Sequence, residues 1–205
     1  GWTASDFVWA TPHRLPFGPL VNYGYDGEVL LPMQITAPAE ARPGETITLR
    51  GKADFLVCAD ICIPESADLE LKLPVTAGPA PADGVWGAKI AKALADAPKP
   101  AGLTGAFQAA DGRVQLAIVG PPLRGADMAD AYFFPFSGTV IDHAKPQAIE
   151  RGPEGLTLTM TASYDFQGPT PPKELAGVLV VAGKGYELTA VSGPPAPSLR
   201  WPRWP

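Results

Sequence analysis

Alternating hydrophobic and polar residues recur along the chain, and this pattern predicts short β-strands rather than long helices. Isoleucine and leucine alternate with threonines over 45–49, and three leucines alternate with charged residues over 69–73. The run 28–35 is also predicted as a strand, although Pro32 places it at a sheet edge. The two alternating strands flank the segment GKADFLVCADICIPESA, so we expect an antiparallel pair with both cysteines near the turn.

The second half of the chain predicts one short helix followed by closely spaced strands. Asp83 can cap the helix, in which Trp86, Ile90 and Leu94 recur at every fourth position before Pro98 ends it. Six or seven short strands separated by turn residues fit a β-sandwich. They are expected around Phe107 and over 114–119, 131–136, 147–149, 156–162, 178–182 and 186–191.

A change in composition after Pro74 indicates a domain boundary. The segment VTAGPAPADG is rich in small residues, Pro and Gly, which is typical of a linker. We predict one domain over 1–78, a second β-sandwich over 79–192 and a proline-rich linker over 193–205. The predicted fold is therefore mainly β, with two immunoglobulin-like β-sandwich domains and one short helix near their boundary.

Composition and charge exclude several classes of protein. The 205 residues include 22 Gly and 25 Pro, which favours turns over long helices. The 16 basic residues are scattered and are outnumbered by 21 acidic ones, so the chain lacks the clustered positive charge of a nucleic-acid-binding domain. No apolar stretch approaches the ~18 residues that span a membrane. The start GWTASDF lacks the regions of a secretion signal, so we expect Gly1 to be a processed or cut end.

Two cysteines, Cys58 and Cys62, occur in the string VCADICIP. A disulfide that closes a ring of about five residues stabilises a fold by ~2 kcal/mol, against ~4.7 kcal/mol for a ring of about 100. As a purely structural bond, this pair would be inefficient. Close spacing does let one sulfur resolve a mixed disulfide formed by the other, as dithiol exchange requires. The spacing therefore favours a redox function.

Other interpretations of the Cys58–Cys62 pair stay open. One is a non-catalytic immunoglobulin-like binding module with a structural disulfide. Zinc usually needs four Cys or His ligands, and His13 and His143 lie in different predicted domains. Two thiolates can hold Cu(I), with Met33 as a third candidate ligand, in a domain for copper tolerance. A hydrolytic cysteine would need His13 as its base.

Charges beside the cysteines indicate how the pair reacts. Asp60 and Glu65 are acidic, and no basic residue is closer than Lys52. Negative charge disfavours a thiolate. We therefore expect a partner's thiolate to attack the disulfide, rather than this dithiol to act as a strong free nucleophile.

The segment GKADFLVCADICIPESADLELKLPV, preceded by VNYGYDGEVLLPMQI, resembles the N-terminal periplasmic domain of the DsbD and ScsB family of membrane thiol-disulfide reductases, and most closely the ScsB-like branch. The resemblance is good over 9–75 and looser over the remainder of the chain, and its specific element is Cys-x-x-x-Cys-x-Pro-Glu. It implies that a thioredoxin-like donor domain of the same membrane-anchored protein reduces this domain. The domain would in turn reduce periplasmic thioredoxin-fold acceptors, in cytochrome c biogenesis or copper tolerance.

The same resemblance implies roles for the two cysteines. Cys62 would form mixed disulfides with donor and acceptor, and Cys58 would resolve them. The protein would act as a protein-disulfide reductase without a bound cofactor or metal, because the dithiol itself carries the two electrons.

A cap loop with an aromatic residue shields the cysteines in this family, and RLPFGPLVNYGY is its counterpart here. The resemblance makes Phe17 the candidate cap, with Tyr23, Tyr25 and Asp26 lining the same site. The alternative is that Phe17 is a core aromatic and that the other three are packing or turn residues.

Two departures from the family affect these expectations. The DsbD branch has more residues between its cysteines, so the turn and cap geometry do not carry over in detail. Family members also have strands before the counterpart of Gly1, so the first sandwich is expected to lack N-terminal strands.

The second domain is expected to be a spacer or docking platform. Its solvated loop residues would be Asp127, Asp130 and His143, and its core residues Phe133, Phe134 and Phe136.

Overall fold

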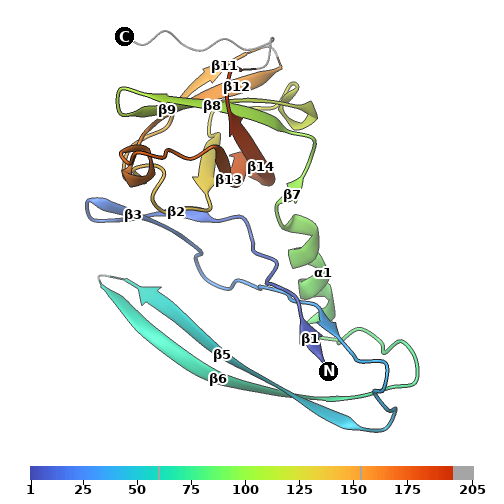
Figure 1. Cartoon of the computed structure of the whole chain (residues 1–205). Helices are drawn as coiled ribbons and strands as arrows, with labels where there is room; N and C mark the ends of the chain where they lie inside the picture. Colours follow the sequence, from blue (N-terminus) through green and yellow to red (C-terminus); the bar gives the residue numbers. More distant parts are fainter. Residues whose placement is uncertain (60, 153, 196–205) are drawn as a thin grey trace. The chain divides into compact units, whose positions relative to one another are not determined.

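The computed structural model describes residues 1–59, 61–152 and 154–195 (Figure 1). The fold is mainly β with one α-helix, as predicted. Contacts between Cα atoms divide the chain into two compact units. The first comprises 1–8 and 32–91, and the second comprises 9–31 together with the described residues from 92 onward. Residues 9–31 therefore group with the second half, whereas the domain bounds 1–78 and 79–192 stay a prediction.

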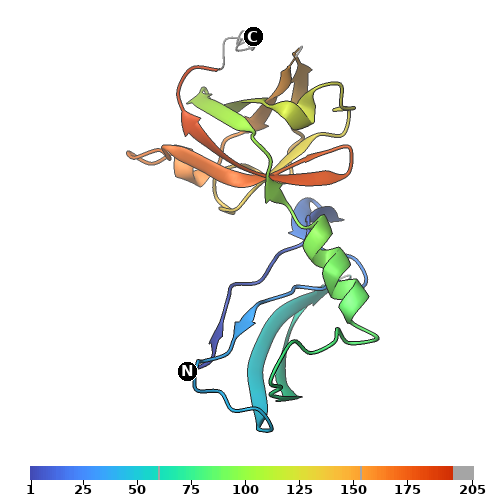
Figure 2. The same ribbon diagram turned by 90° about the vertical axis from the view of Figure 1, so that its right-hand side faces the viewer.

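The first unit is built around one long β-hairpin. Strands β5 (Thr46–Cys58) and β6 (Cys62–Pro74) pair antiparallel along their whole length. Figures 1 and 2 show them as a twisted two-stranded ribbon. The strands predicted over 45–49 and 69–73 are confirmed and are longer than expected, because the pairing continues without a break up to the cysteines.

The strand predicted over 28–35 is wrong except at its end. Only β4 (Ile35–Thr36) is a strand, and it pairs antiparallel with β1 (Thr3–Ala4). The carbonyl of Pro32 instead accepts a hydrogen bond from the Val8 backbone N–H at 2.7 Å. A proline has no N–H to donate to a ladder, so the segment stays extended and irregular.

The predicted helix is confirmed as α1 (Gly87–Asp96). Oδ1 of Asp83 accepts hydrogen bonds of 2.8 Å from the backbone N–H groups of Val85 and Trp86. These bonds lower the pKa of the Asp83 carboxyl and satisfy donors that the start of a helix leaves unpaired. The structure describes no helix that is long and apolar enough to cross a membrane.

The second unit contains an eight-stranded sheet in the order β10-β13-β14-β8-β9-β12-β11, with β7 pairing with β14. Neighbours are antiparallel, except that β14 pairs in parallel with β7 and β8. The sheet curls on itself in both ribbon views, as in an immunoglobulin-like sandwich. Each strand predicted for this half is found. Their bounds are β7 Lys99–Pro100, β8 Thr104–Ala110, β9 Arg113–Val119, β10 Tyr132–Pro135, β11 Ala148–Arg151, β12 Gly155–Thr161, β13 Glu174–Val181 and β14 Lys184–Ser192.

One hydrophobic core fills the curled sheet, and its largest buried side chains include Phe107 and Phe133. Phe134 is buried as well, in a smaller cluster with Tyr132 and Val178. The prediction that Phe136 is a core residue is wrong, because its side chain is 67% exposed. It follows Pro135, the last residue of β10, and therefore lies outside the alternation of the strand.

A glutamine side chain links the two end strands of this sheet. Oε1 of Gln147 accepts a hydrogen bond of 2.9 Å from the Phe133 backbone N–H, and its Nε2 donates one of 2.8 Å to the Phe133 carbonyl. Phe133 lies in β10, and Gln147 directly precedes β11. The amide thus takes the place of a neighbouring strand at this residue.

The second unit also contains a hairpin that the sequence pattern did not predict. It consists of β2 (His13–Phe17) and β3 (Leu20–Gly24). Gly18, the first of the two turn residues, has a φ of 57°. Glycine at this position is typical of a type II′ turn. The dipeptide Gly18-Pro19 between two short runs was therefore the available signal for the hairpin.

Candidate functional site

The tip of the β5–β6 hairpin brings the two cysteines together as a disulfide. Cys58 ends β5 and Cys62 begins β6, and the two are direct partners in the antiparallel register. Their Cα atoms lie 4.0 Å apart. The pairing of two long strands therefore fixes the sulfurs side by side, as the sequence predicted from the turn position.

The disulfide lies on the polar face of the hairpin. Directly opposed residues share a face, and successive residues along a strand alternate between faces. The cysteine pair therefore shares its face with the Lys52–Asp68 and Arg50–Glu70 pairs. Ion pairs run along this face, including Arg50 Nε to Glu70 Oε2 at 3.1 Å and Lys52 Nζ to Asp54 Oδ1 at 3.4 Å.

The opposite face of the hairpin carries the apolar side chains that a core would bury. Strand register places on it Ile47, Leu49, Phe55, Val57, Ile63, Leu69, Leu71 and Leu73. The cysteines occupy even positions, whereas Leu69, Leu71 and Leu73 occupy odd ones. This parity can be read from the sequence alone. The disulfide therefore lies on the face opposite the apolar side chains of the hairpin.

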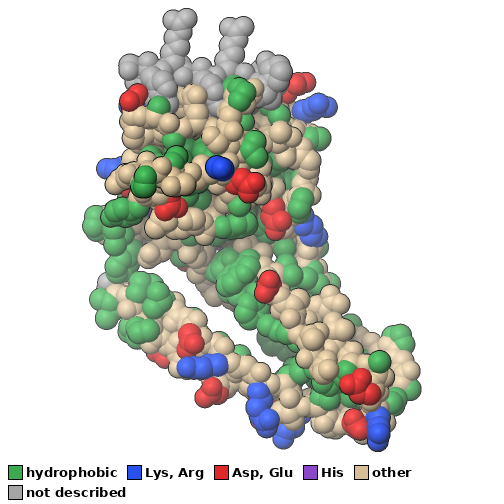
Figure 3. Space-filling model, in the orientation of Figure 1, with side chains coloured by type: hydrophobic (Ala, Val, Ile, Leu, Met, Phe, Trp, Pro, Cys, Tyr) green, Lys and Arg blue, Asp and Glu red, His purple; other side chains and the backbone are tan. Residues whose placement is uncertain are grey.

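Both cysteines are exposed, and so are the apolar residues around them. Leu56 and Ile61 are each 66% exposed, and Val57 is 54% exposed. Figure 3 shows apolar side chains gathered at this end of the hairpin. Exchange requires that an attacking sulfur reach the disulfide, and these exposures leave the bond accessible.

Basic side chains lie far from the disulfide in the hairpin register. Among the described residues of the hairpin, Lys52 is the basic residue closest in sequence to Cys58, and its ammonium pairs with Asp54. Asp60, which the sequence places between the cysteines, lies outside the described residues. The described charges thus agree with the expectation that no local cation stabilises a thiolate here.

The candidate cap residue lies in the other unit. Phe17 ends β2, is partly buried and pairs with Leu20 across the turn. It belongs to the unit formed by 9–31 and the second half, whereas both cysteines belong to the first unit. The capping role of Phe17 stays a prediction.

The other three residues expected to line the site each have a partner within the second unit. Tyr25 donates a hydrogen bond of 3.0 Å to the carbonyl oxygen of Ala10. Oδ2 of Asp26 lies 3.8 Å from Nδ1 of His13, and both side chains are exposed. Tyr23 is partly buried in β3. A role for them at the disulfide likewise stays a prediction.

Tyr23 attaches the β2–β3 hairpin to the large sheet. Its hydroxyl oxygen lies 2.9 Å from that of Tyr132. Its ring centroid lies 4.8 Å from the ring centroid of Phe134 and 4.5 Å from that of His143. Burial strongly raises the pKa of Tyr23, so its hydroxyl stays protonated. Sequence reasoning missed this cluster because Tyr23 and Tyr132 are 109 positions apart.

His143 is not the fully solvated residue that the sequence predicted. Its Nε2 is buried and has no hydrogen-bond partner among the described residues. Burial lowers the pKa of His143, while the nearby Asp142 raises it. The imidazole packs against the Tyr23 ring as part of the aromatic cluster.

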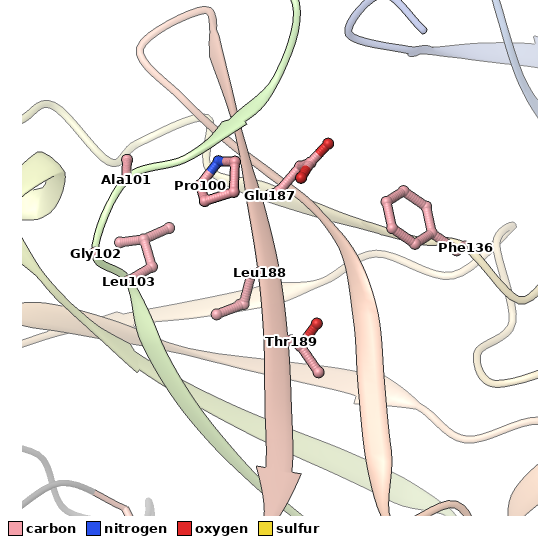
Figure 4. Close-up of a pocket in the computed structure, with 8 residues that line it drawn as sticks. All are labelled: Pro100, Ala101, Gly102, Leu103, Phe136, Glu187, Leu188 and Thr189. Carbon is pink, nitrogen blue, oxygen red and sulfur yellow. The ribbon is translucent and has the colours of Figure 1, made fainter. Parts of the chain in front are cut away.

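An open pocket of about 220 Å³ lies elsewhere in the second unit. Figure 4 shows its lining, which is largely apolar and includes Leu103, Phe136 and the carboxylate of Glu187. Across the part of the chain that the structure describes, no three His, Cys, Asp or Glu side chains group as metal ligands. The disulfide thus remains the strongest candidate site.

Comparison with known proteins agrees with this choice. Residues 1–74 match the family model described as thiol:disulfide interchange protein DsbD, N-terminal. The match ends at Pro74, the last residue of β6, and so contains the whole cysteine hairpin. No curated protein and no solved structure matches the chain. The match and the disulfide together support a thiol-disulfide exchange domain of the DsbD family in this part of the chain.

Proposed function

We propose that this protein relays reducing equivalents from a thioredoxin-like donor domain to partner proteins through Cys58 and Cys62, as a protein-disulfide reductase. The observation that carries the proposal is an exposed disulfide at the tip of a hairpin, on the face opposite its apolar side chains. The DsbD-type match over 1–74 supports the same chemistry.

The reaction is a pair of thiol-disulfide exchanges. A donor thiolate attacks Sγ of Cys62, the bond to Cys58 breaks, and Cys58 leaves as a thiolate that takes up a proton. The donor's second thiolate then attacks the mixed disulfide, and Cys62 is released and protonated. The donor becomes a disulfide, and the pair gains two electrons and two protons.

The second half of the cycle reverses these roles. The Cys62 thiolate attacks one sulfur of an acceptor disulfide, and the other acceptor sulfur leaves as a thiolate. Cys58 then attacks Cys62, which restores the disulfide and releases the reduced acceptor. The assignment of Cys62 to the partner and Cys58 to resolution comes from the family resemblance.

The hairpin supports resolution by keeping the two sulfur-bearing residues opposed. Cross-strand pairing of β5 and β6 runs up to the tip and places Cys58 opposite Cys62, and we expect this pairing to keep them opposed when the bond is open. A resolving thiol that is already in place makes the second step intramolecular, and such proximity strongly accelerates a reaction. The strands thus provide the geometry, and no further catalytic group is required by the scheme.

The wider setting follows from the family. We propose a periplasmic location, attachment to a transmembrane domain in the full-length protein, and a donor domain in that same protein. Acceptors would be thioredoxin-fold proteins of the kind served by the ScsB-like branch. The DsbD-type match supports this setting as a whole, without distinguishing the branch.

Direct electron transfer tests the proposal. Reduced thioredoxin, mixed with the oxidised protein, should be converted to its disulfide form while free thiols appear on this chain, which mass spectrometry after rapid alkylation would follow. A Cys58→Ser/Cys62→Ser double variant should leave thioredoxin reduced. A wild-type protein that stays oxidised in excess reduced thioredoxin would refute the relay function.

A further inference from the structure

His143 contacts the β2–β3 hairpin where this hairpin meets the large sheet. The centroid of its ring lies 4.5 Å from that of Tyr23 in β3. The Tyr23 ring also packs edge-on against Phe134, and its hydroxyl oxygen lies 2.9 Å from that of Tyr132. Tyr23 thus holds the β2–β3 hairpin against both β10 and His143, so a change in the imidazole acts on the attachment of the hairpin.

An added proton on His143 would have no acceptor inside this contact. Nε2 of His143 is buried, and no described protein group lies within hydrogen-bond distance of it. A neutral imidazole can carry its proton on Nδ1 and leave Nε2 as a bare acceptor. Protonation would instead place both an N–H donor and a positive charge at the buried atom. A buried donor or charge without a partner is costly, so the contact favours the neutral ring.

The carboxylates near His143 do not offset this cost. Burial lowers the pKa of His143, and the charge of Asp142 raises it by less. The Asp142 carboxylate also accepts a hydrogen bond of 3.0 Å from the backbone of its own turn. Gly138 lies beside the His143 ring, with a Cβ at this position only 3.9 Å from Cε1. The carboxylate nearest to that loop, Asp165, accepts a hydrogen bond of 3.2 Å from the Ser137 hydroxyl.

The β2–β3 hairpin brings positive charge to the same cluster. The guanidinium of Arg14 lies 4.8 Å from the centroid of the Tyr132 ring. Burial raises the pKa of Tyr23 and the charge of Arg14 opposes this effect, so Arg14 is within electrostatic reach of the Tyr23 ring. The carboxylate that follows the hairpin, Asp26, lies 3.8 Å from His13. A cation on the imidazole would therefore be added to a cluster that already holds Arg14.

We propose that protonation of His143 releases the β2–β3 hairpin from the large sheet, so that this attachment responds to pH. The released segment would include Phe17, which ends β2. A histidine whose pKa is lower in the attached state binds protons preferentially in the released state. The attachment should therefore be complete above the ordinary histidine pKa of ~6.5 and weaken as the pH falls through that value. The inference is independent of the disulfide chemistry.

Amide hydrogen exchange of the whole chain at pH 7.5 and pH 5 tests the proposal. Protection factors are compared, because they remove the intrinsic pH dependence of exchange. Amides of β2 and β3 should lose protection by about three- to 30-fold at pH 5, the upper figure being the limit for a released histidine of ordinary pKa. Amides of β9 and β12 should stay within about twofold, since the release is local. An equal loss in β9 and β12 would indicate global unfolding and overturn the proposal.

The chain has two histidines, which provide a matched pair of variants. His143→Phe keeps a ring against Tyr23 but takes up no proton, so the protection of β2 and β3 should change by less than about twofold over the same pH range. His13→Gln removes the other imidazole, which is exposed beside Asp26, and should retain the wild-type response. An NMR titration of the wild type should give His143 a pKa below that of an ordinary histidine. A pKa at or above ~6.5, or an equal pH response in His143→Phe and wild type, would overturn the proposal and leave the relay function untouched.

Discussion

Replacing Cys62 with serine should abolish exchange, whereas replacing Cys58 with serine should trap it. With Cys62→Ser, the proposed point of attack is gone, and transfer to an acceptor should fall to the background of the thiol buffer. With Cys58→Ser, Cys62 can still form the mixed disulfide, but no resolving thiol stands opposite it at the hairpin tip. Non-reducing electrophoresis of each reduced variant, after incubation with oxidised thioredoxin and alkylation, would reveal the adduct, because Cys62 attacks the thioredoxin disulfide and one thioredoxin sulfur leaves as a thiolate.

The double cysteine variant is the matched control for both single variants. It keeps the strands of the hairpin and should form no adduct. A stable adduct on Cys62→Ser and none on Cys58→Ser would reverse the assigned roles of the two sulfurs. Full exchange activity in either single variant would contradict the dithiol mechanism itself.

A Gln147→Leu substitution should lower the free energy of unfolding of the second unit by about 2–4 kcal/mol. Leucine has a similar size but cannot replace the two hydrogen bonds to the Phe133 backbone. Phe133 is fully buried, so water could not replace the lost partners of its N–H and C=O groups. Buried polar groups without hydrogen bonds lower the stability of the folded state. Chemical denaturation followed by fluorescence would measure the loss.

A Gln167→Leu variant provides the comparison. Gln167 is exposed in the same unit, so this change should alter the unfolding free energy by less than about 0.5 kcal/mol. If the two variants were equally stable, the Gln147 amide would not be what links β10 to the strand that follows Gln147.

Local patterns in the sequence were sufficient to predict most of the strands and the position of the disulfide. Leucines at every second position determine the 69–73 strand, and its partner at 45–49 follows the same rule. The two strands place Cys58 and Cys62 at a tight turn, because the chain between them has no room for another element. The Asp83 cap and the end of α1 were likewise encoded within one turn of the helix.

Contacts between distant residues were not predictable in this way. In the sequence, Gln147 looks like an ordinary loop glutamine, and only the structure shows its hydrogen bond to the β10 backbone. Tyr23 likewise looks like a turn residue, and only the structure shows its hydroxyl next to that of Tyr132. These contacts also group residues 9–31 with the second half rather than with the cysteine hairpin that follows them in sequence. Only tertiary packing reveals such partners, since no short-range periodicity encodes them.

The reduction potential of the Cys58–Cys62 pair tests the central claim most directly. Equilibration with reduced and oxidised dithiothreitol, followed by alkylation and mass spectrometry, would give its value. An exchange pair should have a potential above about −300 mV, within the range of known dithiol carriers. A value clearly below about −300 mV would mark a bond that biological thiols leave closed, and would contradict the relay.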